Sequence, residues 1–191
     1  SDATRAAYGF HADHMVIGTV SRIADLKGHD DLLHAIAPLM QRDERLRLLW
    51  VGDGWRREDR LALARKLGLA GRIVVTGMLT SSKIPSLIQC CDLLVHPSYR
   101  EGLPRVVVQA MLARVPVVAT DADGTREVCV PEKTGRLVPI ADVEALRSAL
   151  QHHLDHPHCS QQWAEQAEAL VRTQFTEDAM VNALETLYAK L

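Results

Sequence analysis

Short apolar runs rich in β-branched residues alternate along this sequence with longer segments whose apolar residues recur three and four positions apart, and this alternation limits the possible folds. The short runs are typical of buried strands, and the longer segments of amphipathic helices. Strands are expected at 15–20, 46–51, 73–76, 93–96, 116–120 and 135–138. Because runs without a polar face must be covered on both sides, they predict a doubly wound α/β fold with a parallel sheet of about six strands.

Helices are expected between these strands and at the end of the chain, at 30–40, 56–67, 82–90, 105–113, 143–154, 160–173 and 177–189. A length of 191 residues corresponds to one domain, and no shift in composition marks a linker. We therefore expect a single Rossmann-like domain over residues 1–191, extended by the last helices.

Charge and composition argue against several classes of protein. The formal net charge is −2, with 22 Lys and Arg against 24 Asp and Glu, so the chain lacks the basic field that holds nucleic acid. Its apolar stretches are far shorter than the roughly 18 residues that cross a bilayer. The four cysteines are Cys90, Cys91, Cys129 and Cys159. Their spacing contains no C-x2-C pair and does not suit a disulfide framework, which favours a reducing compartment.

Two basic residues follow the first expected strand. In an open parallel sheet, ligands bind beyond the carboxyl ends of the strands, so the loops that leave each strand are the places to search. Arg22 and Lys27 lie in one such loop, and Gly28 lets the backbone turn close to a ligand there. Taken singly, each cation could be an ordinary surface charge. Their shared strand end favours the interpretation that the pair binds phosphate.

The loop after the fourth strand contains Glu101-Gly102-Leu103-Pro104, directly before an expected helix. A helix start offers unpaired amides to an anion, here those of Leu103, Arg105 and Val106. A carboxylate beside a phosphate site is suited to sugar hydroxyls, although Glu101 could instead be a helix-capping acid. His96, where the strand ends, is open to two interpretations: a catalytic group, or a hydrogen-bonding partner of this loop.

Seven segments occur in an order and at spacings that resemble a known family. They are IGTVSRIADLKG (17–28), LLWVGDG (48–54), VTG (75–77), CDLLVHPS (91–98), EGLPRVVVQAMLARVPVVAT (101–120), GTREV (124–128) and TGRLVP (134–139). Each is weak alone. Together they are similar to the carboxyl-terminal domain of a family 4 glycosyltransferase, an enzyme with the two-domain GT-B fold. The resemblance runs from about Arg5 to Leu191.

The resemblance implies roles for individual residues. Arg22 and Lys27 correspond to the basic pair that neutralises the diphosphate of a nucleotide sugar and stabilises the leaving group. Glu101 corresponds to the first glutamate of an E-x7-E motif, which contacts the donor sugar, so these three residues are the expected catalytic set. The expected donor-binding residues are Gly77 and Met78 at the nucleotide base, with Gly102, Leu103, Pro104, Arg105 and Gln109.

Position 109 departs from the family pattern. The family usually has a second glutamate that holds the ribose hydroxyls, whereas Gln109 still accepts a hydrogen bond but brings no charge. Two alternatives stay open: a non-catalytic nucleotide-binding or regulatory module, and a sugar-nucleotide epimerase of the same fold. Activity gained on Gln109→Glu in a longer enzyme would indicate a working site. A dehydrogenase is disfavoured, because no G-x-G-x-x-G follows the first strand.

The reaction that the resemblance implies moves a sugar from a nucleotide-diphosphate sugar, most commonly a UDP-sugar, to an acceptor with retention of anomeric configuration. No metal ion and no other cofactor is expected. The acceptor would bind an amino-terminal domain outside this sequence, so the chain alone should bind donor weakly without transferring sugar. The last helix should then expose an apolar face that includes Leu184, Leu187, Tyr188 and Leu191. The expected setting is the cytoplasm or the inner face of the membrane, in polysaccharide or lipopolysaccharide biosynthesis.

Overall fold

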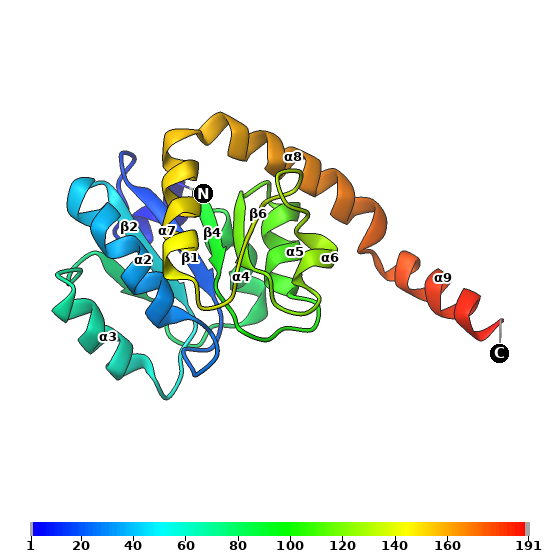
Figure 1. Cartoon of the computed structure of the whole chain (residues 1–191), viewed down its shortest axis with the longest axis horizontal. Helices are drawn as coiled ribbons and strands as arrows, with labels where there is room; N and C mark the ends of the chain where they lie inside the picture. The colour runs from blue at the N-terminus through cyan, green and yellow to red at the C-terminus, as the bar shows by residue number, and fades with distance from the viewer. Residues whose placement is uncertain (1, 190–191) are drawn as a thin grey trace.

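Six parallel strands form one sheet in the computed structural model, which describes residues 2–189 (Figure 1). The strands are β1 (Met15–Val20), β2 (Leu46–Val51), β3 (Ile73–Val75), β4 (Leu93–His96), β5 (Val117–Thr120) and β6 (Arg136–Val138), and their order in the sheet is β3-β2-β1-β4-β5-β6. The predicted doubly wound fold is therefore confirmed. The strand order reverses between β1 and β4, which pair directly, and such a reversal opens a crevice for ligands.

The helices largely confirm the predicted segments. They are α1 (Asp2–Ala7), α2 (His29–Arg42), α3 (Arg57–Lys66), α4 (Ile84–Ile88) after the 3-10 turn η1 (Ser81–Lys83), α5 (Arg105–Leu112), α6 (Thr125–Val128), α7 (Val143–Asp155), α8 (Pro157–Gln174) and α9 (Glu177–Tyr188). The short α1 and α6 were not predicted, since four to six residues give too few turns for a clear apolar period. Helix α8 begins at Pro157, three residues before the expected start, because proline is tolerated in the first turn of a helix.

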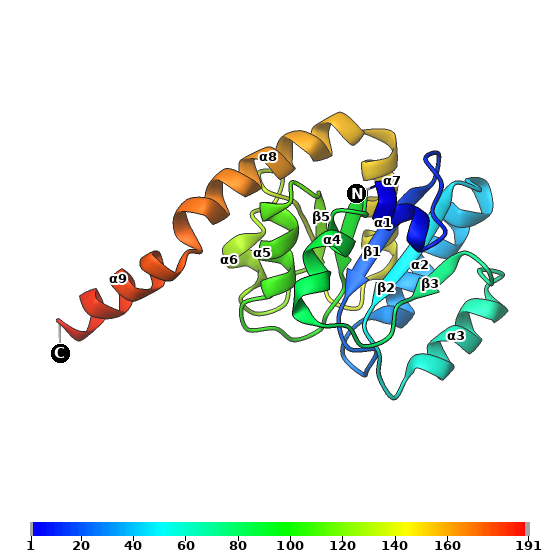
Figure 2. The same cartoon turned by 180° about the vertical axis from the view of Figure 1, so that it is seen from behind.

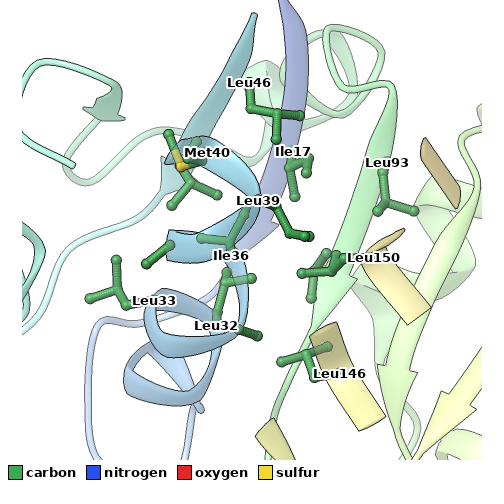
Figure 3. Close-up of a cluster of buried hydrophobic side chains, with 14 of the residues drawn as sticks. Ile17, Leu32, Leu33, Ile36, Leu39, Met40, Leu46, Leu93, Leu146 and Leu150 are labelled. Carbon is green, nitrogen blue, oxygen red and sulfur yellow. The ribbon is translucent and has the colours of Figure 1, made fainter. Parts of the chain in front are cut away.

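Two apolar clusters, one on each face of the sheet, form the core. Helices α2 and α7 cover the face seen in Figure 1, and α4 and α5 cover the face seen from behind in Figure 2. In Figure 3, Leu32, Ile36 and Leu39 of α2 lie beside Leu146 and Leu150 of α7, and Ile17 of β1 is seen higher in the same view. These side chains are almost completely removed from solvent, and burying each of them stabilises the fold by roughly 1.5–3 kcal/mol.

A proline in α2 is accommodated by a side chain from another helix. Pro38 lies inside α2 and has no N–H, so the carbonyl of His34 loses its usual helical partner. Arg147 of α7 donates to that carbonyl over 3.2 Å and to the carbonyl of Ala35 over 3.3 Å. A break in the backbone hydrogen bonding of α2 thus becomes a link between α2 and α7.

Helix α9 extends away from the sheet and its covering helices (Figures 1 and 2). Its large apolar side chains are 44–69% exposed, namely Met180, Val181, Leu184, Leu187 and Tyr188. The predicted exposed apolar face is confirmed for Leu184, Leu187 and Tyr188, while Leu191 lies outside the described residues. Within residues 2–189, none of the helices combines the length and the apolar character needed to cross a membrane.

Candidate functional site

The loops after β1 and β4 pack directly against each other at the reversal of strand order. The amide of Tyr99 donates to the carbonyl of Leu26 over 2.8 Å, and the hydroxyl of Tyr99 donates to Asp31 of α2 over 2.7 Å. Gly28 makes this approach possible: its φ is 66°, and a Cβ atom there would lie 1.9 Å from the carbonyl oxygen of Pro97. A glycine at this position therefore lets the two loops bring their polar side chains together.

Gly28→Ala is expected to lower the free energy of unfolding by about 3 kcal/mol, because it adds a backbone clash to a left-handed conformation. Gly68→Ala is the matched control, since Gly68 has a φ of 75° and nothing within 4 Å of an added Cβ. It should cost only about 1–2 kcal/mol. Urea unfolding of both variants measures the difference. Equal losses would show that the Gly28–Pro97 contact places no constraint on the loops.

A carboxylate with two nitrogen neighbours lies at the centre of this junction. Lys27 Nζ donates to Glu101 Oε1 over 2.6 Å, and His96 Nε2 lies 3.1 Å from the same oxygen. The side chains of Lys27 and Glu101 are 20% and 17% exposed. Lys27 Nζ also donates to the Ser98 hydroxyl over 3.3 Å. The structure therefore brings Lys27 and Glu101, two members of the expected catalytic set, into a largely buried ion pair.

Glu101 stays ionised despite this burial. Burial raises the pKa of its carboxyl, but the polar groups of His96, Lys27 and Ser98 outweigh that effect and lower the pKa to about 2. On the backbone, the amide of Glu101 donates to Asp123 Oδ2 over 3.1 Å, which ties the loop to the one that follows β5. A carboxylate held in this way is an acceptor for hydroxyl groups across the physiological pH range.

Arg22, the other predicted cation, has a different environment. Its side chain is exposed and forms no ion pair or hydrogen bond with any residue between 2 and 189. It lines a hollow of about 140 Å³ together with Met78, Gly52 and Ile84. Met78 is 77% exposed, and Gly77 beside it has a φ of 71°. The hollow thus joins the predicted phosphate cation to the residues expected at a nucleotide base.

The other predicted donor residues surround the start of α5. Pro104 is buried immediately before the helix, and Gly102 lies in close contact with Gly124, where an added Cβ would lie 2.5 Å from the Gly102 carbonyl oxygen. A second hollow, of about 460 Å³, separates α5 from the bend between α8 and α9. It is lined on the α5 side by Leu103, Arg105, Val108 and Gln109, and on the other by residues 174–177 and Met180.

Sequence reasoning missed several contributors to this site. Ser98 and Asp123 hold Lys27 and the Glu101 backbone, and Thr120 donates to the carbonyls of His96 and Ser98. Their position in the sequence could have identified them, because each is a polar residue at or just beyond the carboxyl end of a buried strand. In residues 2–189, no group of three or more His, Cys, Asp or Glu side chains is arranged to hold a metal ion.

Sequence comparisons place this arrangement among known proteins. The family described as "Glycosyl transferases group 1" matches residues 1–170. The alpha-D-kanosaminyltransferase of Streptomyces kanamyceticus is 31% identical over 187 residues, which are 98% of this chain and 48% of that protein. The putative glycosyltransferase EpsD of Bacillus subtilis is 30% identical over 97% of this chain and 48% of its own length. The chain therefore spans about half the length of these relatives.

Solved structures agree with the sequence comparisons. Anabaena Alr3699/HepE, determined in complex with UDP, superposes with a TM-score of 0.88 at 26% identity, over 100% of this chain and 52% of that one. The carboxyl-terminal domain of a glycosyl transferase group 1 family protein, LpcC from Francisella tularensis, has the same fold, with a TM-score of 0.78 at 22% identity over 85% and 87% of the two chains. With a family match that covers most of its residues, this chain belongs to the group 1 glycosyl transferases.

Proposed function

We propose that this chain is the donor-binding half of a retaining glycosyltransferase that uses a UDP-sugar. The observation that carries the proposal is that the loop after β1 supplies two cations, Arg22 and Lys27, and that Lys27 pairs with Glu101 from the loop after β4. A pyrophosphate needs cations and free amides, and a sugar needs hydrogen-bond acceptors for its hydroxyls. The cations and the carboxylate therefore lie in loops at the same edge of the sheet.

The comparisons support a sugar nucleotide as the ligand. Alr3699/HepE has been determined with UDP and with UDP-glucose, and it aligns with the whole of this chain. Its remaining length, and that of the relatives above, leaves room for a second domain, which we propose binds the acceptor. The exposed apolar face of α9 is suited to packing against such a domain. Since nucleotide sugars are made in the cytoplasm, we place the reaction there.

Calorimetric titration with UDP, GDP and ADP tests the proposed donor. We expect UDP to release the largest heat, with a dissociation constant in the weak range, because the groups that would close the site over the nucleotide lie outside this chain. UDP-glucose should bind at least as well as UDP if Glu101 contacts the sugar. The absence of binding by all three nucleotides would contradict the proposal, and preferential binding of GDP or ADP would correct the choice of donor.

Transfer should require the acceptor half. The chain alone is expected to leave UDP-glucose intact in the presence of acceptor sugars, because acceptor positioning supplies much of the rate. The longer protein, assayed by NMR of the anomeric proton, should give a product with the donor's own configuration. Full turnover by the chain alone, or an inverted product, would contradict this part of the proposal.

A further inference from the structure

The partner of Lys27 in this structure differs from the partner that the proposed function assigns to it. Lys27 Nζ is bound to Glu101 Oε1 and to Ser98, whereas neutralising a pyrophosphate would require the ammonium group to turn toward the ligand. Its three N–H groups allow some sharing, but Glu101 would lose a close cation just when its carboxylate is needed by the sugar. Another group must then hold the carboxylate in place.

His96 is positioned to do so. It is 4% exposed, and its Nε2 atom lies 3.1 Å from Glu101 Oε1, although the two groups do not have the geometry of a hydrogen bond. No other residue in the described part of the chain is a hydrogen-bond partner of this nitrogen. Buried polar atoms without a partner are rare, and this one faces the oxygen that Lys27 would release.

The backbone around His96 holds the ring in this position. His96 ends β4, where it is paired with Ala119 of β5, and Thr120 donates its hydroxyl to the His96 carbonyl over 3.3 Å. The side chain therefore projects from a strand buried between two others, rather than from a mobile loop. A group that must orient a carboxylate works best from such a rigid element.

We propose that His96 is a positioning residue that takes over the Glu101 carboxylate when Lys27 turns toward the donor pyrophosphate. The inference rests on the proposed function for the departure of Lys27, and on the geometry of this structure for the role of His96. The charged and polar groups that face Glu101 are Lys27 from the loop after β1, His96 and Ser98 from β4 and its loop, and Asp123 from the loop after β5.

The first test needs no donor, because Lys27→Met imitates the departure of the ammonium group. Carboxyl carbon NMR follows the titration of Glu101 in the Lys27→Met chain and in the Lys27→Met/His96→Leu chain. We expect the Glu101 pKa to stay below 4.5 in the first and to rise by at least about one unit in the second, since a hydrogen bond to the charged form lowers a carboxyl pKa. Identical titrations in the two chains would overturn the proposal.

Conservative replacement distinguishes positioning from mere support of the fold. In the Lys27→Met/His96→Gln chain, the Glu101 pKa should lie below its value in the Lys27→Met/His96→Leu chain, because the glutamine amide can donate to the carboxylate and leucine cannot. His158→Leu, at an exposed histidine, is the matched control and should change nothing. Thermal unfolding confirms that each variant is folded. Failure of glutamine to recover any of the shift would leave only a packing role for His96 and refute the proposal.

The second test uses UDP and UDP-glucose as probes of the otherwise unchanged chain. His96→Leu should lower the affinity advantage of UDP-glucose over UDP by about tenfold, the value of one hydrogen bond to a charged group, while UDP affinity itself stays within about twofold. Equal weakening of both ligands would contradict a positioning role. If the unsubstituted chain binds neither ligand, the proposed function fails, whereas the donor-free titration still decides the role of His96.

Discussion

Replacing Arg22 and Lys27 together by alanine is expected to weaken UDP binding by at least about 100-fold, since each charge-assisted hydrogen bond to phosphate contributes about 1.5–3 kcal/mol. Arg22 is exposed and has no side-chain partner among residues 2–189, so its loss is expected to remove only ligand contacts. Calorimetry with UDP measures the change, and unaltered affinity would refute the assignment of both cations to the pyrophosphate.

The two single variants should behave differently. Arg22→Ala is expected to weaken binding without lowering the free energy of unfolding, whereas Lys27→Ala removes the cation that pairs with a carboxylate only 17% exposed. Lys27→Ala should therefore also destabilise the chain, because breaking a largely buried pair leaves a charge without its partner. A stability loss confined to Arg22→Ala would reverse this assignment.

A charge-matched control separates local contacts from the overall field. Arg65 and Lys66 are exposed residues in the last turn of α3, and Arg65→Ala/Lys66→Ala removes the same two positive charges away from the crevice. That variant should bind UDP as the unsubstituted chain does, because exposed charges beyond about 10 Å are screened at 0.1 M salt. Equal weakening in both double variants would indicate long-range attraction rather than a site.

The free energy of unfolding is expected to decrease strongly in mildly acidic solution. Stability is expected to fall by about 3 kcal/mol between pH 6.5 and 5, and by about 5 kcal/mol between pH 6.5 and 4, because two buried histidines fold in their neutral form. Burial lowers the pKa of His29 to about 4, assisted by the charges of Arg60 and Lys27. Burial also lowers the pKa of His153 to about 4, against an opposing contribution from Asp92.

The sign follows from proton uptake on unfolding. Both histidines have a folded pKa of about 4 against 6.5 when unfolded, so between these values the unfolded chain binds more protons. The contribution of the two histidines to stability is therefore complete only well above pH 6.5, and it is lost as the pH falls through 6.5 toward 4. The packing of His29 agrees with a neutral ring. The ring meets the Trp50 ring edge-on, with the ring centres 5.1 Å apart, and neither of its nitrogens has a hydrogen-bond partner among residues 2–189.

Urea unfolding between pH 7 and 5 measures this dependence above the range where carboxyl groups take up protons. His29→Phe, which keeps an aromatic ring against Trp50, should remove about half of the slope, and His153→Leu the other half. His158→Gln, at an exposed histidine, is the control and should leave the slope unchanged. A pH dependence that survives both core replacements would show that other groups cause it and would contradict this prediction.

The sequence predicts the central strands of this protein more accurately than some of its helices. The bounds of β1, β2 and β4 agree with the predicted segments to the residue, because strands covered on both faces are mainly apolar and end where polar loop residues begin. The region 82–90 was predicted as one helix but divides into η1 and α4, since Pro85 and the polar residues before it favour a tight turn first.

The candidate site divides in the same way. Arg22, Lys27 and Glu101 could be singled out because they follow strand ends and match a family motif; the structure pairs Lys27 with Glu101, and Arg22 lines a separate hollow. The pairing of Lys27 with Glu101 was not predicted, since the two residues are 74 positions apart and are brought together only when their loops pack, with Gly28 against Pro97. The orientation of His96, left open by the sequence, depends on the same packing.

The layers of the fold, the edge of the sheet where the candidate residues lie and the chemical types of those residues could thus be predicted without coordinates. Periodicity and strand ends are local properties, so they can be read along the chain. The oxygen that Lys27 holds, and the absence of a hydrogen bond at His96 Nε2 and of an ion pair at Arg22 within residues 2–189, follow from packing that no local pattern encodes. These are contacts between segments distant in sequence, and side-chain packing in three dimensions selects among them.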